Sequence, residues 1–250
     1  MITAKHIAYG VGDTQILDDV CVSLKPGTVT AILGPNGAGK SSLLKCLSGT
    51  LSPCRGDIYF NGVNLQGYPL EELSRRRGVL SQSIALHFPF TVLELVMMGR
   101  HPYIDSPASQ DDKQVVQWAL ESVDAWSLKD RVFPSLSGGE QQRVQLARVL
   151  GQIWAQQQAC LFLDEPTAAL DLKYQHQIFQ LIGQLADDYA LTVCVILHDP
   201  QLARRYCDQA ILMQQGQVFA AGSTARVLAP ENIECVYEVP PDWIGGWVPL

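Results

Sequence analysis

The chain has 250 residues, of which 47% are hydrophobic and 17% charged, and this composition excludes an intrinsically disordered protein. A net charge of −7, from 18 Lys and Arg against 25 Asp and Glu, disfavours a protein that binds nucleic acid through its phosphates. No apolar run approaches the roughly 20 residues of a membrane-spanning helix, and the N-terminus lacks a signal-peptide core, so we expect a cytoplasmic protein.

In chain order, the first predicted elements are two kinds of strand and one helix. The alternating segments at 18–24 and 56–62 fit antiparallel strands, whereas the continuous apolar run at 29–33 fits a strand buried on both faces. A helix is expected from residue 40 until Gly49 ends it. The order strand, glycine-rich loop, helix is therefore predicted near the N-terminus.

The middle of the chain changes to a helical period. Thr91 and Glu94 are placed as a capping box, and Ser137 and Glu140 as another. The helix after Ser137 is expected to turn a stripe toward the core that consists of Leu146, Ala147, Leu150, Ile153 and Trp154. We expect a helical subdomain at approximately residues 91–155, inserted in a single domain of residues 1–250.

The second half of the chain returns to strands. The apolar runs at 159–163 and 191–197 fit two more strands buried on both faces, and the segments around Gln215 and Gly216 fit an antiparallel hairpin. The expected fold class is therefore α/β, with a parallel sheet core bordered by antiparallel strands.

Seven cysteines are spread along the chain, with no CxxC pair and no Cys/His spacing typical of zinc. We interpret them as buried thiols, and a catalytic thiol is the lesser alternative. They are Cys21, Cys46, Cys54, Cys160, Cys194, Cys207 and Cys235.

The segment GPNGAGKSS matches the pattern G-x-x-x-x-G-K-[ST] between the predicted strand and helix. Its glycines allow backbone N–H groups to turn toward a phosphate chain, Lys40 would reach the terminal phosphates, and the Ser41 hydroxyl would ligate Mg²⁺. A plain glycine-rich turn is the alternative, but the context favours nucleotide binding by Gly34, Pro35, Asn36, Gly37, Ala38, Gly39, Lys40, Ser41 and Ser42.

Two further segments carry chemistry. Asp164 and Glu165 end a predicted buried strand, where the first carboxylate can hold Mg²⁺ through water and the second can polarise an attacking water. A capped helix explains Ser137 but not Gly138 and Gly139 in its first turn, where glycine weakens a helix. These glycines indicate a second phosphate contact.

Together these segments resemble the ATP-binding subunit of an ABC transporter over nearly the whole chain. GPNGAGKSS is similar to the Walker A motif, LSGGE to the family signature, LFLDEP to the Walker B motif, and ALD, ending at Asp171, to the D-loop. The resemblance implies an ATPase that uses ATP and Mg²⁺. It also implies a P-loop NTPase core with a mixed central sheet, an antiparallel β subdomain and an inserted helical subdomain.

The resemblance assigns roles to single residues. Glu165 would be the general base, and His198 in VILHD would contact the γ-phosphate. Gln82 in GVLSQS would be the Q-loop residue, which takes part in catalysis and binds Mg²⁺. Tyr9 in IAYG would stack on adenine, and an edge-strand aromatic is the alternative reading. LSGGE, with Ser137, would complete the ATP site of a second copy, so that two chains form an ATP-sandwich homodimer.

The resemblance also implies partners and cargo. The partners would be integral membrane permease subunits and, indirectly, a periplasmic substrate-binding protein, with the chain peripheral at the cytoplasmic face of the inner membrane and no nucleic acid bound. The segment FPFTVLELVMMGRHPY is most similar to that of haem importer ATPases within the iron-chelate and cobalamin class. Haem is therefore the expected cargo, with a ferric siderophore or cobalamin as alternatives.

Other classes of protein fit less well. A soluble ABC-type ATPase of DNA repair would need a long heptad insertion, which this sequence lacks, and one of iron–sulfur assembly would not need the segment at 88–103. Glu165 and His198 argue against a regulatory module without turnover, and a small-molecule kinase would have no use for LSGGE. The apolar side chains of Phe88, Phe90, Met97 and Met98, within residues 82–103, are interpreted as a surface that couples the ATPase to a permease. For Met97 or Met98 the alternative is a place in the core of the helical subdomain.

Overall fold

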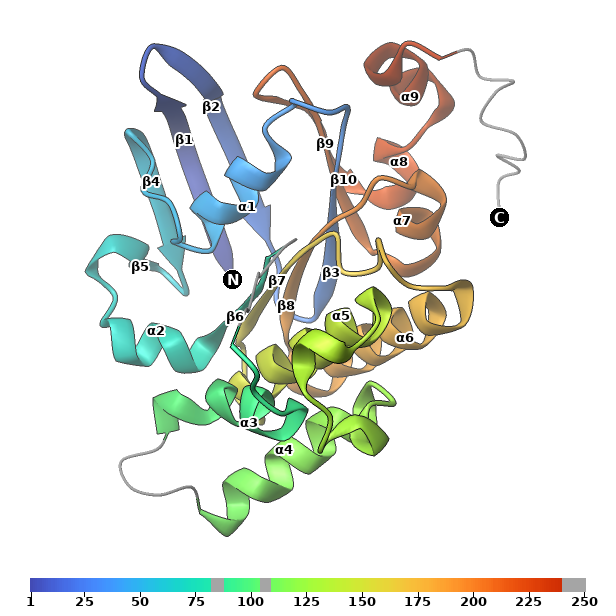
Figure 1. The fold of residues 1–250 in the computed structure, drawn as a ribbon. Coiled ribbons are helices and arrows are strands. Elements are labelled where there is room, and N and C mark those ends of the chain that lie inside the picture. Colours follow the sequence, from blue (N-terminus) through green and yellow to red (C-terminus); the bar gives the residue numbers. More distant parts are fainter. Residues whose placement is uncertain (82–87, 104–108, 240–250) are drawn as a thin grey trace. The chain divides into compact units, whose positions relative to one another are not determined.

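The computed structural model describes residues 1–81, 88–103 and 109–239, which fold into helices and strands in mixed order (Figure 1). The chain divides into two compact units. The first comprises Met1–Gly67 and Cys194–Leu250, and the second comprises Tyr68–Val193. The α/β class predicted from the sequence is confirmed.

The first unit contains a four-stranded antiparallel sheet with the strand order β2-β1-β4-β5 (Figure 1). Its alternating sequences turn every second side chain inward, as in β4, where Ile58 and Phe60 are buried. The two predicted alternating strands are thus confirmed. The strands are β1 (Ile2–Val11), β2 (Thr14–Leu24), β4 (Arg55–Phe60) and β5 (Val63–Asn64).

A parallel pair and a hairpin form most of the remaining strands of this unit. β3 (Thr28–Leu33), buried almost throughout, pairs in parallel with β9 (Gln209–Gln214), which pairs antiparallel with β10 (Gln217–Ser223). The hairpin turn lies where the sequence predicts it, because Gln215 and Gly216 both have positive φ, 48° and 80°, as a type I′ turn requires.

The helices of the first unit include the predicted one after the glycine-rich loop, which is followed by Gly49 at a positive φ of 70°. These helices are α1 (Lys40–Leu47), α7 (Pro200–Tyr206), α8 (Thr224–Val227) and α9 (Pro230–Tyr237), with a 3₁₀ turn at Leu65–Gly67. β8 (Thr192–Ile196), buried in every residue, contains the division between the two units.

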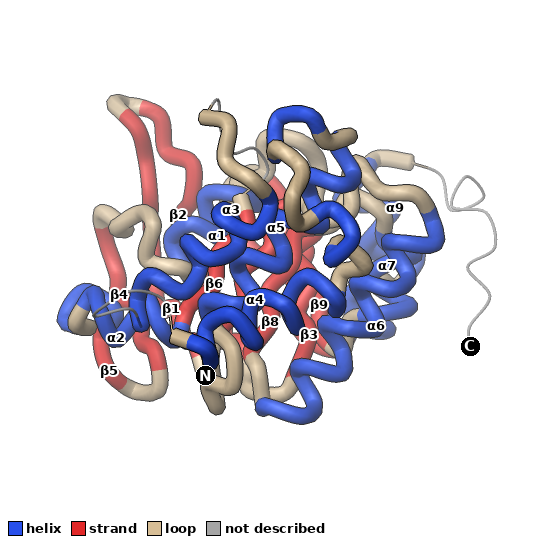
Figure 2. The backbone as a smooth tube through the Cα atoms, turned by 60° about the horizontal axis from the view of Figure 1, so that its bottom comes forward, coloured by secondary structure: helices blue, strands red, loops and turns tan. Residues whose placement is uncertain are grey.

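The second unit is mainly helical (Figure 2). Each of three of its helices begins at a capping box: Thr91 with Glu94, Ser109 with Asp112, and Ser137 with Glu140. Its helices are α2 (Leu70–Arg76), α3 (Val92–Met97), α4 (Gln110–Ser122), α5 (Gly138–Gln152) and α6 (Leu172–Tyr189), with 3₁₀ turns at Met98–Tyr103, Trp126–Leu128 and Phe133–Ser135. β6 (Arg77–Leu80) and β7 (Cys160–Asp164) form a parallel pair.

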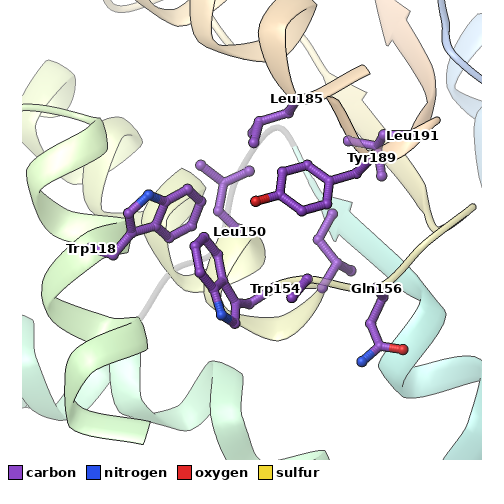
Figure 3. Close-up of a pocket in the computed structure, with 9 residues that line it drawn as sticks. Trp118, Leu150, Trp154, Gln156, Leu185, Tyr189 and Leu191 are labelled. Carbon is purple, nitrogen blue, oxygen red and sulfur yellow. The ribbon is translucent and has the colours of Figure 1, made fainter. Parts of the chain in front are cut away.

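An aromatic cluster joins three parts of the second unit (Figure 3). The rings of Trp118 and Trp154 lie 3.9 Å apart between centroids, and Trp154 lies 6.4 Å from Tyr189 of α6. Trp154 was expected within the buried stripe of the helix, which is wrong, because α5 ends at Gln152 and Trp154 lies beyond it, half-buried. Leu146, Ala147, Leu150 and Ile153 are buried as predicted.

The prediction that all cysteines are buried is also wrong. Cys46, Cys160, Cys194 and Cys207 are buried, whereas Cys21, Cys54 and Cys235 are exposed. Cys21 shows the reason, because β2 alternates and turns Val20 and Val22 inward. Within the described residues no helix is long and apolar enough to cross a membrane.

Candidate nucleotide-binding and catalytic site

The glycine-rich loop lies in the first unit, between β3 and α1. Gly34 has a φ of 143°, and a Cβ atom there would lie 2.2 Å from the carbonyl oxygen of Met213, so only glycine fits. Lys40 is 7% exposed, and its Nζ donates hydrogen bonds to the carbonyl oxygens of Gly34, at 2.8 Å, and Pro35, at 2.9 Å. The lysine ammonium is therefore held inside the curve of the loop.

Two contacts from distant parts of the chain hold this loop. The backbone N–H of Gly216, in the β9–β10 turn, donates to the carbonyl oxygen of Ala38 at 3.1 Å. At the other end, the N–H of Gly34 donates to the hydroxyl of Tyr237 at 2.9 Å. The loop was predicted from the sequence, but neither of these two contacts was, and no local motif marks Tyr237.

His198 also belongs to the first unit and follows β8. The N–H of Leu197 donates to the carbonyl oxygen of Ile32 at 3.2 Å, so the end of β8 lies beside the end of β3. Gly34 follows β3 by one residue, and His198, which is exposed, follows β8 by two. The structure thus brings His198 and the phosphate loop to neighbouring strand ends.

Tyr9 lies on β1, where it is paired with Leu17 of β2. The edge-strand reading of Tyr9 is wrong, because β1 lies between β2 and β4. The side chain of Leu17 in turn packs closely against Gly39. A Cβ atom at Gly39 would lie only 2.9 Å from the Cδ2 atom of Leu17. Tyr9, half-buried, lines a surface hollow with Asp13, Thr14, Gln15 and Arg55, among others.

Asp164 and Glu165 lie in the second unit, at the end of β7. Asp164 is 4% exposed, whereas Glu165 is less buried and has a positive φ of 52°. A non-glycine residue in this conformation stores backbone strain that its surroundings must hold, and such strain is frequent at active sites. Gln142 supplies part of this support, since its Nε2 donates to the carbonyl oxygen of Glu165 at 2.8 Å.

The signature segment begins α5 in the same unit. Ser137 is its N-cap, exposed, and the Oγ of Ser137 donates to Glu140 Oε2 at 2.8 Å. Hydrogen bonds from the backbone and then the side chain of Ser137 lower the pKa of Glu140. Gly139 has a packing reason to be glycine, because a Cβ atom there would lie 3.0 Å from the carbonyl oxygen of Ala169. Gly138 is exposed, and a Cβ atom there would meet only ordinary contacts.

The D-loop residue Asp171 has a structural task as well. Its side chain caps α6 by accepting a hydrogen bond from the N–H of Tyr174 at 3.1 Å. Gln82 lies outside the described residues. Gln142 was missed by sequence analysis as a functional candidate, although it stands in the segment LSGGEQQR.

A glycine-rich loop between a buried strand and a helix, with a lysine held inside it, defines the class of P-loop nucleotide-binding proteins. No cluster of three or more His, Cys, Asp or Glu side chains arranged to hold a metal ion occurs in the part of the chain that the structure describes. Mg²⁺ bound with a nucleotide does not need such a cluster, because phosphate oxygens and water supply most of its ligands.

The family is given by comparison with known proteins. The model of the family described as "ABC transporter" matches residues 17–168, and the chain belongs to this family. It is 44% identical to the hemin import ATP-binding protein HmuV of Hydrogenovibrio crunogenus, over 96% of this chain and 94% of the relative. It is 41% identical to the protein of the same name in Escherichia coli O157:H7, over 95% of this chain and 92% of that one.

A solved structure agrees with the fold. The dimeric, post-hydrolysis state of the ATP-binding cassette MJ0796, bound to ADP and Pi, superimposes with a TM-score of 0.78. The match has 27% sequence identity and covers 90% of this chain and 99% of that one.

Proposed function

We propose that this chain is the ATP-hydrolysing subunit of a membrane complex that imports haem. The observation that carries the proposal is the identity of 41% to 44% with hemin import ATP-binding proteins, which extends over nearly the full length of both chains. We propose one ABC ATPase domain of residues 1–250, with the helical subdomain at approximately 91–155 inserted in it.

The phosphate loop would bind the β and γ phosphates of ATP. Its backbone N–H groups and the N-terminus of α1 supply hydrogen bonds and partial positive charge, and Lys40 supplies a full charge. On binding, the Lys40 ammonium exchanges the carbonyl oxygens of Gly34 and Pro35 for phosphate oxygens. Pro35, Asn36, Gly37, Ala38, Gly39, Ser41 and Ser42 complete this cradle, and Tyr9 stacks on adenine.

Hydrolysis requires a base and charge stabilisation. Glu165 accepts the proton of the attacking water, and His198 stabilises charge on the γ-phosphate. Mg²⁺, when bound, would neutralise part of the phosphate charge, and Ser41, Gln82 and Asp164 would hold it, directly or through water. The oxygen chemistry of Ser41 and Asp164 fits a hard cation.

A second copy of the chain would complete each site. Ser137, Gly138 and Gly139 of one copy contact the γ-phosphate held by Lys40 of the other, with Asp171 at the same contact. Two features support this pairing: Ser137 and Gly138 are exposed at a helix N-terminus, and the related cassette MJ0796 is dimeric with ADP and Pi.

The permease would be contacted by the segment around Phe88. Phe88 is 64% exposed, Met98 is 41% exposed, and the rings of Phe88 and Phe90 lie 4.6 Å apart between centroids. Exposed apolar side chains of this size are typical of a contact surface. From the similarity to hemin import ATP-binding proteins, we also propose that the chain lies at the cytoplasmic face of the inner membrane, with a periplasmic substrate-binding protein acting on the other side of the permease.

Vesicles that contain the chain and its permease test the proposal, with a haem-loaded binding protein added outside. Haem should accumulate inside only with ATP, and Glu165→Gln should lose at least nine-tenths of ATPase activity and uptake while it still binds ATP. Asp188→Asn, on the exposed face of α6, is the matched carboxylate control and should behave as the parent. Uptake of a ferric siderophore or cobalamin instead of haem would overturn the cargo and leave the ATPase assignment intact.

A further inference from the structure

Tyr237, the last residue of α9, is hydrogen-bonded to the first residue of the phosphate loop. The N–H of Gly34 donates to the phenol oxygen of Tyr237 at 2.9 Å, although 203 positions separate the two residues. Both residues lie in the first unit. Burial raises the pKa of the Tyr237 hydroxyl, so the group is a neutral acceptor at physiological pH.

The helix that carries Tyr237 packs against the core through two buried side chains. Pro230 begins α9, and Ile233 and Val236, which are 2% and 3% exposed, pack its inner face into the core. The hydroxyl of Tyr237 is therefore presented from a fixed element rather than from a free end. An acceptor on a fixed element can restrain the group that donates to it.

The phosphate loop needs such restraint. Gly34, Gly37 and Gly39 have positive φ values of 143°, 80° and 95°, and glycine loses more conformational freedom than any other residue when a chain is ordered. A loop that is already ordered before a ligand arrives binds it more tightly, because less entropy is lost on binding. The bond to Tyr237 fixes the loop at Gly34, and the bond from Gly216 fixes it at Ala38.

We propose that Tyr237 is a positioning residue for ATP binding. It acts through the N–H of Gly34 and does not touch the nucleotide. The inference rests on the proposed function, because it requires that the loop binds the phosphates of ATP. It gives α9 a task in the nucleotide site that the motifs of the sequence do not reveal.

The variant Tyr237→Phe tests this role, since it removes one oxygen atom and keeps the ring. The dissociation constant of MgATP for the purified chain, and the KM for ATP of the chain assembled with its permease, should each rise about threefold to tenfold, the effect of one lost hydrogen bond. The kcat at saturating ATP should stay within about twofold of the parent, because bound phosphate orders the loop. Amide exchange of residues 29–40 should be faster in the variant without nucleotide and equal to the parent with MgATP.

Two control variants distinguish the positioning role of the Tyr237 hydroxyl from the packing of α9 and from the proposed function itself. Val236→Ala loosens the packing of α9 but keeps the hydroxyl, so it should lower the thermal midpoint and leave the KM for ATP unchanged. Lys40→Ala should abolish tight MgATP binding, and if it does not, the proposed function fails whatever Tyr237→Phe does. An unchanged KM and unchanged exchange in Tyr237→Phe would overturn the positioning role alone. A Tyr237→Phe chain that does not fold would also overturn it, because the hydroxyl would then maintain the fold.

Discussion

The side chain of Gln142 binds the backbone of Glu165, with 2.8 Å between the Nε2 of Gln142 and the carbonyl oxygen of Glu165. The same side chain accepts a hydrogen bond from the N–H of Ala169 at 3.1 Å. Gln142 therefore spans the turn that follows β7 and connects it to the helix of the signature segment. Because Glu165 has a positive φ, this contact helps to maintain a strained conformation at the proposed base.

Replacing Gln142 should reduce turnover more than binding. Gln142→Ala removes both hydrogen bonds, and we expect kcat of the assembled ATPase to fall about tenfold, which corresponds to about 1.4 kcal/mol of lost transition-state stabilisation. The KM for ATP should change little, because the phosphate loop is untouched. Gln117→Ala, at an exposed position of α4, is the control and should keep the parent kcat. If Gln142→Ala and Gln117→Ala have the same kcat, Gln142 does not contribute to catalysis through Glu165.

Acid should destabilise the second unit through its capping boxes. Hydrogen bonds from the backbone and side chain of Thr91 lower the pKa of Glu94, and the Ser137 bonds act likewise on Glu140. For Asp112, burial acts to raise the pKa, but bonds from Ser109 and Arg100 outweigh it and lower the pKa.

A carboxyl group whose pKa is lower in the folded chain than in the unfolded chain stabilises the fold at pH values above its unfolded pKa. That contribution begins to be lost near pH 4, where unfolded Asp and Glu titrate, and disappears as the pH falls through the lower folded values. Thermal midpoints measured from pH 7 down to pH 3 should therefore fall steeply below about pH 4.5. Glu94→Gln should show a shallower fall, and an identical pH profile for this variant would contradict the assignment.

Two glycines of the second unit should respond oppositely to alanine. A Cβ atom at Gly99 would lie 2.2 Å from the carbonyl oxygen of Arg148, so Gly99→Ala should destabilise the chain by about 1–3 kcal/mol or more. At Gly151, within α5, the nearest atom to an added Cβ would be the Cβ atom of Ala119, at 4.0 Å. Gly151→Ala should therefore stabilise by up to about 1 kcal/mol. Urea unfolding of both variants checks the sign of each change.

Thiol labelling should divide the cysteines into two groups. Cys21, Cys54 and Cys235 are exposed and should react with a maleimide at pH 7.5 within minutes. Burial raises the pKa of Cys46 to about 11 and of Cys160 and Cys207 to about 12, and Cys194 is buried as well. These four should react only after unfolding. Mass spectrometry of the native chain that finds more than three labels would show that the buried group opens.

Most local elements of this chain could be predicted from the sequence. The capping boxes at Thr91 and Ser137 and the turn at Gln215 and Gly216 lie where they were expected. Each depends on contacts within a few residues, so a short stretch of sequence contains all the information. The phosphate loop was found for the same reason, because Gly34 to Ser42 are contiguous.

The expectations that were wrong concern burial. Cys21 was expected inside and is exposed, and Trp154 was expected on a buried stripe and lies beyond the end of α5. Cys21 faces away from the buried Val20 and Val22 on an alternating strand, and Trp154 follows the end of a helix, so in both cases burial depends on which face of an element meets the core and on where the element ends. A single sequence does not state where a helix ends or which face is covered.

The sequence by itself determined the chemical groups of this protein: a lysine in a glycine-rich loop, an acidic pair after a buried strand and a histidine after another. Only the tertiary structure decided which groups support them. Tyr237 reaches Gly34 across 203 positions, and Gln142 reaches Glu165 across 23. Such pairs are fixed by the packing of whole elements, α9 against the core and α5 beside the end of β7, and no local propensity or motif encodes that distance.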